Sequence, residues 1–123
     1  MKKIHDLLCQ YWVALSVLIL LLITVLSLTP LPELPAVPGS DKSHHFIAYG
    51  ALMFSVGLRK PKYWLFVGAF FVAWSGAIEL IQPYVNRYGE WLDLAANVGG
   101  LTTGFVAGRL FSYLIARMDN SAH

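Results

Sequence analysis

The sequence predicts an all-α membrane protein, a transmembrane bundle of four antiparallel helices. Three observations carry this prediction: 57% of the 123 residues are hydrophobic, only 13% are charged, and long apolar runs alternate with short polar or proline-rich connections. A soluble chain of this composition would expose large apolar patches to water. The length leaves room for one domain, residues 1–123. We therefore expect helices at about residues 9–28, 41–58, 63–83 and 91–115.

The first expected helix rests on the apolar run of residues 11–28, which follows Lys2 and Lys3. A helix over this run measures about 27 Å, close to the hydrocarbon thickness of a bilayer. A basic start before an apolar run is also typical of a signal peptide. This run is long for one, however, and no Ala-x-Ala-like cleavage site follows it. We interpret it as a retained membrane helix.

The second expected helix, residues 41–58, follows a connection that contains Pro30, Pro32, Pro35 and Pro38. Prolines this dense cannot continue a helix. The purely apolar part of the segment is short, so it fits either a span or a re-entrant piece. With its polar first turn it reaches about 27 Å, and we interpret it as a span.

Small residues recur at every fourth position in the last two segments. They are alanines in the third and glycines in the fourth: Ala69, Ala73, Ala77, Gly100, Gly104 and Gly108. Such stripes let membrane helices approach each other closely. We expect both stripes to be packing faces rather than ligand sites.

Charge sets the expected orientation. In a four-span arrangement, seven of the nine basic residues fall on one side: Lys2, Lys3, Arg59, Lys60, Lys62, Arg109 and Arg117. By the positive-inside rule, both termini are then cytoplasmic. The bases lie at segment ends rather than along a stripe, which argues against nucleic acid as a partner. Cys9 is the single cysteine, so an intrachain disulfide and a multi-cysteine metal site are excluded.

The same topology gathers the unusual polar residues into one layer at the outer ends of the helices. They begin the second helix, end the third, begin the fourth or lie in a connection: Asp41, Lys42, His44, His45, Glu79, Gln82, Arg87, Asp93 and Asn97. Ionisable groups within membrane segments are costly, so by default they indicate a functional site. A purely structural clasp, in which Lys42 and Arg87 neutralise two of the three acids, would explain much of the same pattern. We expect Arg87 to pair with Glu79 or Asp93.

Four pieces of sequence follow one another in this layer: Asp41-Lys42-x-x-His45-Phe46-x-x-Tyr49, Glu79-x-x-Gln82, Arg87, and Asp93-x-x-x-Asn97-x-x-Gly100-x-x-x-Gly104. In order and spacing they resemble the VanZ-like family of small bacterial membrane proteins. The resemblance covers about residues 41–108. The family's namesake is associated with low-level resistance to the glycopeptide teicoplanin. The resemblance implies a multi-pass protein of the bacterial cytoplasmic membrane that is linked to the cell envelope and to the glycopeptide response; it does not imply that this chain itself confers antibiotic resistance.

Roles follow from the chemistry of the side chains. His45 and Glu79 are the candidate catalytic residues, because histidine exchanges protons near neutral pH and a partly buried carboxyl can do so too. Lys42 and Arg87 are suited to bind phosphate or carboxylate. Five residues are expected to support them: Asp41, Tyr49, Gln82, Asp93 and Asn97. Chemically, His45, Glu79 and Asp93 could hold a metal, but no HExxH-type spacing is present, and we predict no metal and no cofactor.

The sequence therefore suggests a protein with an outward-facing polar pocket that binds or modifies a lipid-linked or cell-wall molecule. The alternative is a non-catalytic structural or partner-binding membrane subunit. Membrane lipid is an expected partner in both cases. Whether the chain is an enzyme, and its oligomeric state, stay open at this point.

Overall fold

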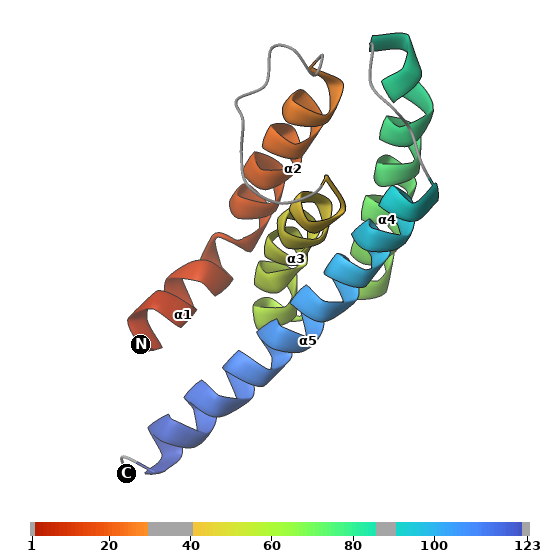
Figure 1. The fold of residues 1–123 in the computed structure, drawn as a ribbon. Helices are drawn as coiled ribbons and strands as arrows, with labels where there is room; N and C mark the ends of the chain where they lie inside the picture. Colours follow the sequence, from red (N-terminus) through yellow and green to blue (C-terminus); the bar gives the residue numbers. More distant parts are fainter. Residues whose placement is uncertain (1, 30–40, 86–90, 122–123) are drawn as a thin grey trace.

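The computed structural model describes residues 2–29, 41–85 and 91–121, and these ranges are helical apart from short turns. In chain order the elements are α1 (Lys2–Gln10), α2 (Trp12–Leu28), α3 (Asp41–Arg59), α4 (Trp64–Ile81), the 3-10 helix η2 (Gln82–Val85) and α5 (Trp91–Ser121). Helices α2 to α5 run alternately up and down, so both termini lie at one end (Figure 1). We call this the terminal end, and the opposite end, where α3 and α5 begin, the polar end. The predicted all-α class is confirmed.

Within the described ranges, two segments are long and apolar enough to cross a membrane: Trp64–Tyr84, with 21 residues, and Leu92–Met118, with 27. Helices α1 and α2 pass the same test together, so a third span is present if this bent pair crosses as one. Length and composition thus indicate a membrane protein. The expected four spans are not confirmed.

Helix α3 falls short as a span because its first turns are polar and it carries Asp41, Lys42 and Arg59. It is instead an enclosed helix. Five of the ten buried hydrophobic side chains in the described ranges belong to it: Tyr49, Leu52, Met53, Val56 and Leu58. A helix that presents much of its surface to other helices does not need the uniformly apolar surface that lipid demands.

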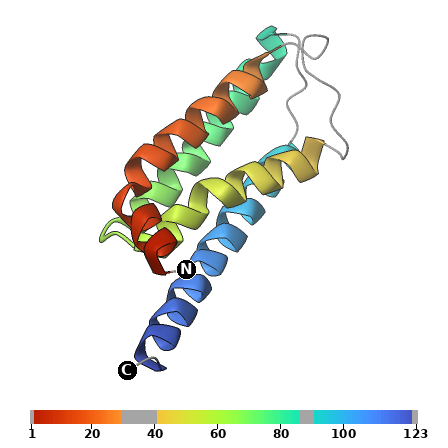
Figure 2. The same cartoon turned by 90° about the vertical axis from the view of Figure 1, so that its left-hand side faces the viewer.

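The expected helix at residues 9–28 is two helices. The chain breaks at Tyr11, and α1 is bent by 73° away from α2 (Figure 2). His5 docks α1 on the bundle, with its Nε2 atom 2.8 Å from Ser112 Oγ of α5. Ser112 Oγ itself donates to the main-chain oxygen of Leu58 at 2.9 Å, so it accepts its hydrogen bond from His5. The polar composition of α1 explains the break, since this segment does not continue the apolar surface of α2.

The closest contact in the bundle joins α3 and α5, which run parallel to each other. It is a backbone contact at the glycines of α5: a Cβ added at Gly100, Gly104 or Gly108 would overlap the backbone of Phe46, Gly50 or Phe54, respectively. On the other helix, a Cβ at Gly57 would overlap the backbone of Phe105. The predicted glycine packing face is therefore confirmed, and its partner is α3.

The predicted alanine packing face is wrong within this chain. Ala69, Ala73 and Ala77 are exposed, and α4 turns Phe71, Ser75 and Ile78 toward the core instead. The core-facing stripe of α4 follows its larger side chains and its one buried serine. The alanines therefore lie on a face that no helix of the described ranges covers.

Two glycines provide a matched test of the α3–α5 contact. Gly104→Ala should lower the free energy of unfolding by about 1–3 kcal/mol, because its methyl group meets backbone that cannot rotate away. Gly76→Ala in α4 should leave stability unchanged or raise it by about 0.5–1 kcal/mol, since nothing lies within 4 Å of the added carbon. Unfolding in detergent, followed by circular dichroism, measures both. Equal effects would contradict the backbone contact.

Candidate functional site

The polar end holds a cluster of buried polar side chains from three helices. They come from the first turns of α3, the last turns of α4 with η2, and the first turns of α5: His45, Ser75, Gln82, Asp93 and Asn97. Ser75 and Asn97 are 0% and 1% exposed. Because buried polar groups are costly unless they are hydrogen-bonded, the partners of these residues define the site.

A chain of hydrogen bonds crosses from α3 to α5 to α4. His45 Nδ1 lies 3.0 Å from Asn97 Oδ1, and Asn97 Nδ2 donates to Ser75 Oγ at 2.6 Å. A carbonyl oxygen only accepts, so the hydrogen of this bond belongs to His45 Nδ1. In a neutral imidazole the lone pair is then on Nε2. The bond therefore leaves Nε2 as the atom that can take up a proton.

Tyr49 extends this chain into the core. It is 1% exposed, its ring stacks near that of His45 with 6.5 Å between centroids, and its side chain is hydrogen-bonded to Ser75. Ser75 thus serves both Asn97 and Tyr49. Glu79, the other predicted catalytic residue, follows Ser75 by four residues on α4, so its carboxyl lies beside the network.

Gln82 connects the cluster to α2. Its Nε2 atom donates to the main-chain oxygen of Ser27 at 3.1 Å, and the residue is 1% exposed. Its Oε1 atom is buried and has no hydrogen-bond partner among the described residues. The hydrogen bond of Gln82 therefore holds the end of α4 against the end of α2. This contact is how Gln82 could carry out its predicted supporting role.

Asp93, a member of the cluster, and Glu79 bring carboxyl groups to the polar end. Asp93 is 5% exposed in the first turn of α5, where a carboxylate is favoured by the helix dipole. Glu79 is half-buried on α4, one turn after Ser75. The structure thus brings six of the predicted residues to one end: His45, Tyr49, Glu79, Gln82, Asp93 and Asn97.

Three predicted residues are not placed. Arg87 and the side chains of Asp41 and Lys42 lie outside the part of the chain that the structure describes. The expected ion pair of Arg87 with Glu79 or Asp93 therefore stays a prediction. In the described ranges, no three His, Cys, Asp or Glu side chains are close enough together to hold a metal ion.

Ser75 was missed by the sequence reasoning, although it is the residue through which Asn97 and Tyr49 meet. A signal was present. Ser75, Glu79 and Gln82 recur at i, i+4 and i+7, which places them on one face of α4. A single serine among apolar residues does not by itself indicate a site, because serine is common in membrane helices.

Comparison of the chain with models of protein families, with curated proteins and with solved structures gives no match. The resemblance to the VanZ-like family therefore rests on the residues quoted above.

A double-mutant cycle tests the bond between His45 and Asn97. His45→Ala and Asn97→Ala should each reduce stability, and the double variant should lose about 1 kcal/mol less than the sum, since the shared bond is lost once. His44→Ala combined with Asn97→Ala is the control, because residue 44 points about 100° away from residue 45. Thermal unfolding in detergent gives the energies. Additive losses for His45 and Asn97 would refute the bond.

Proposed function

We propose that the protein is a VanZ-like protein of the bacterial cytoplasmic membrane, with both termini in the cytoplasm and the polar end facing outward. The polar end binds the polar head of a lipid-linked or cell-wall molecule, and through it the protein acts in the envelope's response to teicoplanin-type glycopeptides. His45 and Glu79 are the groups that would exchange protons with the bound molecule.

The observation that carries this proposal is the buried chain from His45 through Asn97 to Ser75. A helix clasp could be built from amides and hydroxyls alone. A histidine whose tautomer is set by a buried amide is, in contrast, the arrangement that a general base requires. Glu79 would be the second proton-exchanging group, since it is a half-buried carboxyl one turn after Ser75 of the same network.

The direction of the helices supports an anionic ligand. Because α3 and α5 run parallel, their N-terminal ends both lie at the polar end, where the helix dipoles favour negative charge. Lys42 and Arg87 would add positive charge from α3 and from the connection before α5. Phosphate or carboxylate is therefore the head group that we expect, with arginine suited to a bidentate contact.

The second candidate is a structural or partner-binding subunit, and one observation favours it. Ser75 serves both Asn97 and Tyr49, and these three side chains are at most 1% exposed. This part of the network is satisfied without a ligand. In that case the polar end would hold three helices together and no chemistry would follow.

Two substitutions of His45 separate the candidates. In His45→Asn the amide nitrogen takes the place of Nδ1, so the bond to Asn97 is kept while the proton-accepting Nε2 is lost. If the site exchanges protons, this variant should stay folded but fail to restore glycopeptide or cell-wall-stress resistance to a strain that lacks the protein. Glu79→Gln should behave in the same way.

His45→Gln is the matched variant, because its amide replaces Nε2 and the bond to Asn97 is lost. A structural clasp predicts that His45→Asn supports normal resistance and that His45→Gln loses resistance only in proportion to its lower abundance in the membrane. Immunoblotting of membrane fractions beside the resistance assay measures both quantities. Full resistance with a folded His45→Asn variant would refute the proton-exchange role.

The proposed orientation is tested by labelling single cysteines in a Cys9→Ser background. Tyr84→Cys, at an 88% exposed position in η2, should react with an impermeant thiol reagent added to intact cells. Lys62→Cys, in the connection at the terminal end, should react only after the cells are opened. Labelling of Lys62→Cys from outside would overturn the orientation.

A further inference from the structure

An apolar groove of about 370 Å³ lies between α4 and α5 and extends from Val98, next to Asn97, toward the terminal end. Its lining residues lie within residues 64–72 of α4 and 98–106 of α5, on one face of each helix, and Met53 of α3 also lines it. The ring of Trp64 stacks on that of Phe105 at the end near the terminal end, with 4.3 Å between centroids. The exposed Ala69, whose stripe was expected to pack against a helix, is part of one wall.

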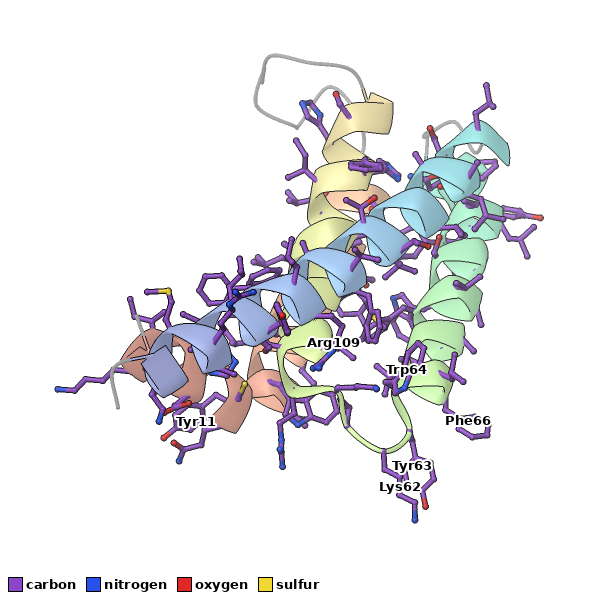
Figure 3. All side chains as sticks on the ribbon, turned by 90° about the horizontal axis from the view of Figure 1, so that it is seen from below. Tyr11, Lys62, Tyr63, Trp64, Phe66 and Arg109 are labelled. Atoms are coloured by element: carbon purple, nitrogen blue, oxygen red, sulfur yellow. The ribbon has the colours of Figure 1, made fainter. Side chains whose placement is uncertain are left out.

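The groove has one basic end. Arg109 lies on the same stripe of α5 as Val98, Thr102 and Phe105, one turn beyond Phe105. In Figure 3, which views the bundle from below, Arg109 lies near Trp64, and Lys62 projects from the connection that leads to α4. Arg109 donates to the main-chain oxygen of Gly57 at 3.3 Å. That bond uses one of the five N–H groups of its guanidinium.

We propose that this groove holds one acyl chain of an anionic phospholipid, with the lipid phosphate against Arg109 and Lys62. Along α5 the lining from Val98 to Val106 covers about 12 Å, close to the roughly 15 Å depth of one leaflet's hydrocarbon. Tyr63 and Trp64 directly follow Lys62 in the chain, and aromatic side chains of this kind are enriched at a membrane interface. An acyl chain therefore fits below a phosphate at this level.

Charge argues against a helix from a second copy in the groove. A copy inserted in the same orientation would bring its own Arg59, Lys60, Lys62 and Arg109 to the same end, and like charges would meet there. A zwitterionic lipid would fill the groove with its chain but would gain less at the phosphate. The lipid site shares no residue with the polar cluster, so it does not depend on the proposed function.

The test is a lipid titration of the purified protein in detergent, with bound lipid counted by native mass spectrometry. Phosphatidylglycerol and phosphatidylcholine with the same acyl chains are the two probes. The first phosphatidylglycerol should bind about tenfold more tightly than the first phosphatidylcholine, because no choline cation offsets its phosphate charge beside the basic residues. Arg109→Gln and Lys62→Gln should each reduce this preference, whereas Arg117→Gln, two turns further along α5, should not.

Two neighbouring threonines give a matched test of the groove itself. Both are exposed on α5, but only Thr102 lines the groove. Thr102→Trp should fill it and abolish the tight first site, while Thr103→Trp should leave that site intact. Unchanged thermal unfolding shows that each variant is folded. His45→Asn should bind lipid as the unaltered protein does, which separates this result from any failure at the polar end.

Four outcomes would overturn the proposal. Equal affinity for the two lipids, or equal effects of the two tryptophan variants, would mean that lipid only surrounds the protein without a site. A dimer mass that is lost in Thr102→Trp would mean that a second copy covers the groove. If glycerol phosphate competes with the same affinity as the whole lipid, then the basic residues simply bind an anion and the groove contributes nothing to the affinity.

Discussion

The backbone contact between α3 and α5 is the constraint on which the rest of the structure depends. At Gly100, Gly104 and Gly108 no side chain separates the two helices, so a rotation or slide of one against the other would make backbone atoms overlap. The two helices are parallel and not adjacent in sequence. Their pairing therefore sets the direction of α3 and the position left for α4. Helix α4 comes after α3 and before α5 in the sequence, but it does not lie between these two helices in space.

The polar cluster is a consequence of this fixed register. Asn97 lies three residues before Gly100, and His45 lies immediately before Phe46, whose backbone Gly100 meets. The two side chains are thus brought within 3.0 Å of each other by contacts that continue along both helices. A hydrogen bond at the end of a rigid pair loses less conformational entropy than one between mobile segments, because its partners are already ordered. The network therefore gains its precision from the glycines rather than from the polar residues themselves.

The sequence was sufficient for features that depend on composition or on one helix. It predicted the all-α class, the glycine face of α5 and the gathering of His45, Gln82, Asp93 and Asn97 at one end. It failed where the outcome depended on which neighbour a helix meets. The break at Tyr11, for example, is accompanied by the docking of His5 on Ser112, 107 residues away, and no local pattern contains that partner.

The alanine stripe and Ser75 both show where prediction from the sequence alone reaches its limit. Alanines at every fourth position have the spacing of a packing face, but α4 meets its neighbours through Phe71, Ser75 and Ile78. Which stripe faces inward was decided by the position of α5, and that position was set by the contact of α5 with α3. Ser75 was overlooked for the same reason, since its importance comes from Asn97 of another helix. In both cases the sequence shows the residue itself but not which residues of the neighbouring helices it contacts.

The attachment of α4 to α5 connects the polar site at one end of the molecule with the groove that leads to the other. Helix α4 is joined to α5 at the polar end by the bond from Asn97 to Ser75, and at the other end by the stacking of Trp64 on Phe105. Ser75 and Trp64 are eleven residues apart, about 16 Å along the helix. Between these attachments α4 presents Gly68, Ala69 and Val72, whose side chains are too short to fill the space. The groove exists because α4 is held against α5 at two places and has small residues between them. The hydrogen bond near the polar end and the aromatic stacking near the terminal end together keep this apolar surface open.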